Sequence, residues 1–256
     1  MKDDLLNRDV RIFRYTDAWD VQLVFDYIAS HPHNAVVAAT AKMELQRDNL
    51  IAITRIILAC RSSDLAGKKP SQGVFRETCV RRSYDEAGLL KEVGVRFRNP
   101  KQRGTLPVNA GGYTSWIDVA VVDPPATAAE ATAPVPCFAS MLCDYIDTTE
   151  HLPRPDDRLF ISSRCYKPGG PPNKPPGYRG IGPEALAKVM GRVMGRAGVP
   201  ADFLPHSARH AGVNYRREQG WTDEDIMEMA NMSARTYVTH YMRKIRRSRL
   251  DNADSG

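Results

Sequence analysis

Residues 73 to 123 carry strand-like patterns in a sequence that otherwise has helical periodicity, and this interruption most limits what the chain can fold into. The stretches "GVFRETCVRRS", "EVGVRFRNPK" and "SWIDVAVVD" alternate in polarity or run through β-branched and aromatic residues, which is typical of short strands. Turn-forming pairs, Asn99-Pro100 and Gly111-Gly112, lie between them. Since the strands stand together rather than alternating with helices, the sequence predicts an α+β fold that is mainly α, with a small antiparallel sheet at one edge.

Helical periodicity precedes the sheet. In "TDAWDVQLVFDYIASHP" apolar residues recur at every fourth position, which predicts a helix capped by Thr16 or Asp17. The segment "NAVVAATAKMELQRDNLIAITRIILACRSSDL" predicts two helices followed by a short one capped by Ser62 or Ser63. The second of these helices buries an apolar face made of Leu50, Ile53, Ile56 and Ile57.

Two loops rich in small residues or proline follow the sheet, and helices follow the loops. "PPATAAEATAPVP" and "KPGGPPNKPPGYRGIGP" flank a helix predicted through Phe138 and Ile146. The stripe in "PEALAKVMGRVMGRAG" predicts the next helix. Gly220 should end the one after it, Thr222 should cap another, and a last helix should run from near Ser233 through "ARTYVTHYMRKIRRSRL".

Composition limits the partners and the cellular environment that we expect for this chain. The 256 residues carry a net charge of +6, which favours a polyanionic partner. Five cysteines form no CxxC pair, as expected of reduced thiols inside a cell. We see no signal peptide and no apolar run of the ~18 residues that a membrane span needs, so we expect no membrane partner. We expect a linker at residues 1–15, one domain over 16–249 and a disordered tail at 250–256.

The segment "LPHSARHAGVNYRREQG" places His206 and Arg209 one helical turn apart, as a pair that can serve one anion. The pair alone is a weak signal, but three other residues accompany it. Tyr241 follows Arg209 by one helix and a turn, Arg61 comes directly after a buried helix in "ILACRSSDL", and Lys101 stands at a strand-end turn in "VRFRNPKQRG".

These residues resemble the active-site set of the tyrosine recombinases, the phage integrase superfamily, over nearly the whole chain. That family has an arginine in a G-x-R-x-x-E context, a hairpin lysine, His-x-x-Arg, a later His or Trp, and a nucleophilic tyrosine. Arg61 with Asp64 matches the first element, with Asp in place of Glu and Cys60 in the approach. Lys101 matches the hairpin lysine, and "HSAR" and Tyr241 match the elements that follow.

One position departs from the family pattern. The later His or Trp falls on Met232, which cannot donate a hydrogen bond, although Asn231 beside it could. His240 could also partly replace this donor, and His210 stands where the family often has a second histidine. Loss of one such donor costs about 3 kcal/mol of transition-state stabilisation, which slows an enzyme without abolishing it.

The resemblance implies a site-specific DNA recombinase or integrase that cleaves and rejoins strands through a 3′-phosphotyrosyl intermediate, without metal, cofactor or ATP. Arg61 and Arg209 would hold the phosphate, Tyr241 would attack it, His206 would take or share the tyrosine proton, and Lys101 would protonate the leaving oxygen. The implied partners are double-stranded DNA and further copies of the chain, assembled as a tetramer on DNA through the segment after the tyrosine. The long inserts suggest DNA integration or transposition by a eukaryotic mobile element, with the protein in the nucleus, or otherwise in the cytoplasm.

Several alternatives stay open. Lys91 or Arg103 would replace Lys101 if the hairpin register differs, and Tyr237 lies one turn before Tyr241. The chain could be a catalytically decayed, recombinase-derived DNA-binding protein, or an enzyme like the type IB topoisomerases, which share this residue set. It could also be a basic structural module with no DNA chemistry, in which case the five matched positions would be coincidental.

Overall fold

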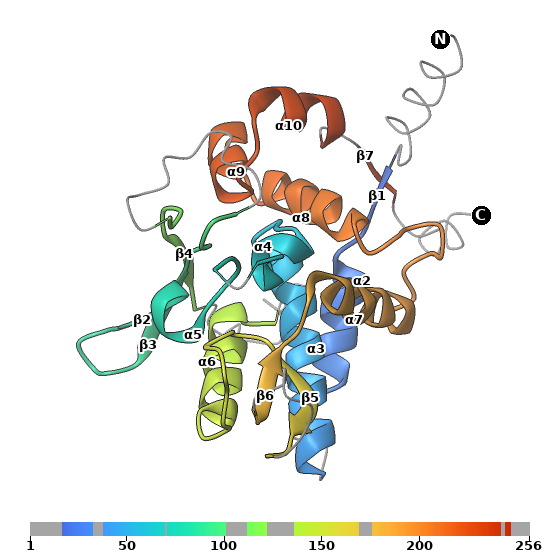
Figure 1. Cartoon of the computed structure of the whole chain (residues 1–256). Helices are drawn as coiled ribbons and strands as arrows, with labels where there is room; N and C mark the ends of the chain where they lie inside the picture. The colour runs from blue at the N-terminus through green and yellow to red at the C-terminus, as the bar shows by residue number, and fades with distance from the viewer. Residues whose placement is uncertain are drawn as a thin grey trace, which may run out of the picture.

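A single long helix, α3 (Ala39–Ile57), runs through the middle of the computed structural model (Figure 1). The structure describes residues 17–32, 38–69, 71–100, 112–121, 136–168, 176–241 and 244–246. We predicted two helices here, and that prediction was wrong. The polar stretch Gln46–Asn49 does not end the helix because it is buried and paired: Arg47 donates to Asp48 at 2.9 Å, and Arg192 donates to Asp48 at 2.7 Å.

The elements before the sheet are short apart from α3. β1 (Asp17–Trp19) precedes α2 (Gln22–Ser30), so the first helix begins later than predicted, where the Asp20 carboxylate accepts the N–H of Gln22 at 2.9 Å. After α3, the chain forms the predicted short helix α4 (Ser62–Ala66), but its N-cap is Arg61 and not Ser62 or Ser63. α5 (Arg76–Cys79) follows, inside the stretch predicted to be a strand.

The predicted antiparallel sheet is confirmed, in the order β2 (Val80–Tyr84), β3 (Leu90–Val95) and β4 (Ile117–Ala120). It lies at one edge of the helices (Figure 1). α6 (Phe138–Thr149) follows as predicted. A second hairpin of β5 (Ile161–Tyr166) and β6 (Gly177–Gly180) was not predicted, because β6 falls in the proline- and glycine-rich segment and forms the edge of a two-stranded sheet.

The C-terminal helices are α7 (Pro183–Arg196), α8 (Ser207–Glu218), α9 (Asp223–Met229) and α10 (Ala234–His240). Gly220, with φ of 79°, follows α8, and Thr222 caps α9 by accepting the N–H of Asp225 at 3.1 Å, both as predicted. The last helix is shorter than predicted. It ends at His240, and Lys244–Arg246 form β7, which pairs in parallel with β1.

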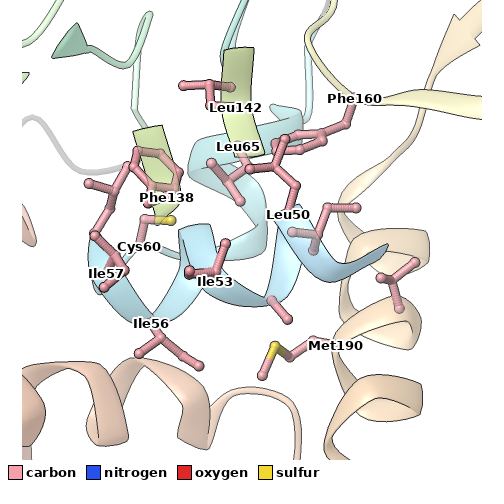
Figure 2. Close-up of a cluster of buried hydrophobic side chains, with 14 of the residues drawn as sticks. Leu50, Ile53, Ile56, Ile57, Cys60, Leu65, Phe138, Leu142, Phe160 and Met190 are labelled. Carbon is pink, nitrogen blue, oxygen red and sulfur yellow. The ribbon is translucent and has the colours of Figure 1, made fainter. Parts of the chain in front are cut away.

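The core surrounds α3. α6, α7 and α8 all pack on this helix, and Figure 2 shows its apolar side chains meeting Phe138 and Leu142 of α6 and Met190 of α7. A second, smaller apolar cluster joins α8, α9 and α10 and contains both Tyr237 and Tyr241. Within the described ranges, no helix is both long and apolar enough to span a membrane.

Candidate active site

The close contact between α3 and α8 brings the N-terminal half of the chain to the His206–Arg209 pair. A Cβ atom on Gly212 would lie 2.2 Å from the backbone oxygen of Ile56, so only glycine allows this approach. One turn further along α8, Arg216 donates from Nε to the Ile57 oxygen at 3.1 Å. Arg209 precedes Gly212 by three residues and therefore lies on the same side of α8, toward the end of α3.

The N-terminus of α8 is held by β1. Trp19 is buried and donates from Nε1 to the hydroxyl of Ser207 at 2.8 Å, and that hydroxyl donates to the Leu204 oxygen at 2.7 Å. His206 is the residue just before α8, so this pair of hydrogen bonds fixes the position of the backbone from which the His206 side chain extends.

Arg61 is positioned by the turn that joins α3 to α4. Ala59 has φ of 42°, in the left-handed region, and it occupies the glycine position of the family pattern. Arg61 then precedes the first residue of α4, and the Asp64 carboxylate accepts its backbone N–H at 2.9 Å. The Asp at this position therefore helps to cap α4 by accepting the N–H of the residue just before the helix.

Arg209 is fully buried and meets the same carboxylate. Its Nη2 donates to the Ala230 oxygen at 2.5 Å, and its Nη1 lies 3.7 Å from Oδ2 of Asp64. Its Nε forms no hydrogen bond with the part of the chain that the structure describes. Arg61 and Arg209 thus lie near the same carboxylate, and burial, followed by the charge of Arg209, lowers the pKa of Arg61.

Tyr241 lies directly beside this arginine pair. It is 4% exposed, and its backbone N–H donates to the Tyr237 oxygen at 2.8 Å at the end of α10. The guanidinium carbon of Arg209 lies 5.5 Å from the centre of the Tyr241 ring. The ring of His210 stacks on the same tyrosine, with centroids 4.3 Å apart and planes at 25°. His210 is therefore a packing residue, and it packs on the candidate nucleophile itself.

His206 completes the group. Its ring meets that of His210 edge to face, with centroids 5.9 Å apart. The side chain is exposed on one side, yet partial desolvation together with the charges of Arg55, Arg209 and Arg61 lowers the pKa of His206 to about 4. Solvent screens part of this repulsion, but every contributing charge acts in the same direction, so the neutral imidazole is the form favoured near neutral pH.

The alternative tyrosine is held elsewhere. The hydroxyl of Tyr237 donates to the Asp223 carboxylate at 2.5 Å, and burial and that hydrogen bond raise the pKa of Tyr237. Ionisation of Tyr237 is therefore disfavoured, and its oxygen is directed to α9.

Met232, at the position of the missing donor, is 3% exposed and packs in the apolar cluster with Tyr241. Asn231 has φ of 47° and lines a cavity together with Trp116 and Trp221. Lys101, Arg103 and the side chain of His240 lie outside the described residues. Lys91 is exposed at the start of β3.

Sequence reasoning missed Arg55, which lies near the end of α3 and is 1% exposed. Its charge is felt by Arg209, Asp64, Cys60 and His206. The sequence did contain a signal, a single arginine in the apolar run "NLIAITRIILA". Arginine is seldom fully buried unless it is paired, so its place in a buried helix indicates an interaction at the end of α3.

Three arginines therefore lie near one buried carboxylate, with an imidazole close to those arginines and a tyrosine beside Arg209. Such a set is suited to an oxyanion held bidentately and attacked by an oxygen nucleophile. The fold that carries it is the one expected from the resemblance: the mainly helical α+β fold of the tyrosine recombinase catalytic domain.

Comparison with solved structures supports this fold. The XerH site-specific recombinase bound to its difH substrate, in a pre-cleavage complex, superimposes with a TM-score of 0.53 at 15% identity over 94% of this chain and 53% of that one. XerH bound to palindromic difH, in a post-cleavage complex, gives 0.50 at 12% identity over 88% and 49%. XerA recombinase gives 0.43 at 13% identity over 80% and 56%.

The chain thus spans about half the length of the recombinase chains that it matches. No model of a known protein family matches the sequence. No curated protein matches it either. The likeness is therefore one of fold, and the activity has to be argued from the site.

Proposed function

We propose that this chain cleaves and rejoins duplex DNA as a site-specific recombinase or integrase, through a phosphotyrosine at Tyr241. The observation that carries the proposal is the meeting of Arg61, His206, Arg209 and Tyr241, which come from three separate parts of the sequence. The Asp64 carboxylate accepts the backbone N–H of Arg61 and lies 3.7 Å from Nη1 of Arg209, and the guanidinium carbon of Arg209 lies 5.5 Å from the centre of the Tyr241 ring. The shared fold with DNA-bound recombinases supports the same reaction class.

The proposed step is a transesterification. The Tyr241 oxygen attacks the phosphorus, forming a P–O bond to tyrosine, and the bond from phosphorus to the 5′ oxygen breaks. The tyrosine proton passes to His206, which the surrounding cations keep neutral and thus able to accept it. The 5′ oxygen leaves with a proton that, by resemblance, comes from Lys101. Reversal by another strand's 5′ hydroxyl conserves the bond, so no ATP is needed.

The two arginines supply the transition-state stabilisation. Attack adds negative charge to the non-bridging oxygens, and a planar guanidinium can bind two of them at once. Asp64 accepts the backbone N–H of Arg61 and lies 3.7 Å from Nη1 of Arg209, so the backbone at Arg61 and the guanidinium of Arg209 are already held in place when the phosphate arrives.

A second candidate function, that of a decayed DNA-binding descendant, is favoured by one observation. Met232 is buried among apolar side chains at the place of a hydrogen-bond donor. Loss of one donor slows such a reaction by a factor of about a hundred to a thousand, so the remaining set still favours an enzyme. Relaxation of supercoils by a monomer would instead indicate an activity like that of the type IB topoisomerases.

Self-association on DNA through the segment after Tyr241 remains part of the proposal. In this structure, that segment forms β7 and pairs with β1 of the same chain. DNA binding should rest mostly on phosphate contacts and weaken steeply with salt.

The test is covalent attachment to DNA. The protein would be mixed, without metal, with nicked duplexes carrying the genomic sequences that flank its gene and with a randomised pool, and adducts would be read on a denaturing gel. We expect an adduct with the wild type and with Tyr237→Phe, and none with Tyr241→Phe. Adducts that persist in Tyr241→Phe and disappear in Tyr237→Phe would assign the nucleophile to Tyr237. Tight binding of every variant without any adduct would favour the decayed descendant.

A further inference from the structure

Arg55 is a buried cation that the proposed reaction does not use. It lies in the last turn of α3, is 1% exposed, and its Nε and Nη1 form no hydrogen bond with the described residues. Leaving a buried guanidinium incompletely paired costs several kcal/mol, whereas an apolar residue here would continue the face of α3. An arginine at position 55 therefore destabilises the fold, and packing does not explain its presence there.

The surroundings of Arg55 indicate a function for its buried charge. The end of α3 is pressed against α8, since Gly212 allows the Ile56 oxygen to approach and Arg216 bonds the Ile57 oxygen. Arg55 is thereby brought to the base of the site, where burial and the charge of Arg209 both lower its pKa, to about 10. At that pKa, Arg55 still carries its full charge at neutral pH.

We propose that Arg55 is a third arginine of the phosphate site, a positioning residue whose charge acts from behind Arg209 and His206 without touching the DNA. The inference rests on the proposed function, because it concerns the same site. Its charge has two effects. It repels a proton from His206, so that the imidazole can accept the one from Tyr241, and it adds to the potential that attracts the phosphate.

His206 is a suitable reporter because the groups around it are known. The groups that act on it or contact it are Arg55 of α3, Arg61 just before α4, and Arg209 and His210 of α8. Cys60, Asp64 and Tyr241 interact with Arg55, Arg61 or His210 and complete the charged and titratable groups of the site. Among the arginines, Arg55 has the largest charge effect on His206, ahead of Arg209 and Arg61.

The first experiment is an NMR titration of the His206 imidazole, assigned by its loss in His206→Gln, from about pH 8 to about pH 4.5. In the wild type we expect the ring to stay neutral over most of this range, as its pKa of about 4 requires. In Arg55→Gln, which removes the charge, we expect the midpoint to rise by about one pH unit. Arg55→Met, which also removes the N–H groups, should give the same rise.

The matched control is Arg47→Gln. Arg47 lies on the same helix and is 6% exposed, but it is paired with Asp48 and donates to the Ile161 oxygen at 3.2 Å. Its loss should lower the stability of the fold and leave the His206 titration unchanged. A wild-type His206 midpoint near the ordinary value of about 6.5 would overturn the proposal, and this result can be obtained even if neither Arg55 variant folds. An Arg55→Gln midpoint equal to that of the wild type would also overturn it.

The second experiment measures adduct formation against pH. Arg55→Gln should lower the rate about tenfold or more, with DNA affinity changed less than about threefold, and should move the acidic limb of the pH–rate profile to higher pH. If the rate falls by the same factor at every pH and the acidic limb of the pH–rate profile does not move, Arg55 is only structural. If the wild type forms no adduct, the proposed function fails, while the titration still decides whether Arg55 controls His206.

Discussion

Gly212→Ala tests whether the α3–α8 contact assembles the site. The added methyl carbon would lie 2.2 Å from the Ile56 oxygen, 3.0 Å from its carbonyl carbon and 3.2 Å from its Cα. All three atoms are backbone, so no rotamer change can relieve the overlap, and the helices must separate by about 1 Å to reach ordinary contact. Overpacking of this kind costs about 1–3 kcal/mol, against an intrinsic gain of about 0.5–1 kcal/mol for alanine over glycine in a helix.

The matched control is Gly195→Ala. Gly195 lies in the last turn of α7, and a Cβ atom there meets nothing within 4 Å. This variant should stabilise the fold by about 0.5–1 kcal/mol. Urea unfolding of both variants, followed by circular dichroism, gives the steric cost as the difference between their free energies of unfolding, which should be about 1–3 kcal/mol.

The same change should disturb the chemistry, because Arg209 lies one turn before Gly212 and moves with α8. We expect adduct formation by Gly212→Ala to fall at least tenfold under conditions where the variant is fully folded. If Gly212→Ala were as stable as Gly195→Ala and cleaved DNA at the wild-type rate, then the contact between the two helices would not be what positions Arg209.

The other predictions concern single contacts. Arg209→Ala should lower the cleavage rate about a thousandfold while changing DNA affinity far less, measured by single-turnover adduct formation and by binding titration; equal losses would argue against a transition-state role. Met232→His should cost about 1–3 kcal/mol of stability, because it buries a polar ring, yet raise the cleavage rate at least tenfold if the donor is missing. Trp19→Phe should lower the free energy of unfolding by about 1 kcal/mol, through loss of its hydrogen bond to Ser207, in a urea titration. Since the pKa of His206 is lowered to about 4, the unfolded chain binds a proton that the folded chain excludes; stability should fall from about pH 6.5 toward pH 4, and less so in His206→Gln.

Much of the fold could be predicted because periodicity and capping are local. The stripe in α7, the Thr222 cap and the strands of the sheet were all readable from neighbouring residues. Prediction from the sequence failed where a residue distant along the chain determines where a helix ends or continues. The polar stretch at Arg47 stays helical because Arg192, far along the chain, pairs with Asp48. The last helix ends at His240, and Lys244–Arg246 pair with β1.

The candidate site divides in the same way. The sequence by itself determined which residue types are available. The spacing of His206 and Arg209 pointed to an anion site, and the resemblance to the tyrosine recombinases implied that Tyr241 is the nucleophile. Only the tertiary structure decided that Tyr237 is bonded to Asp223 while Tyr241 lies beside Arg209. It alone brought Arg55 beneath the site, since the approach of α8 to α3 depends on a glycine, and electrostatic interaction depends on distance in space rather than separation along the chain.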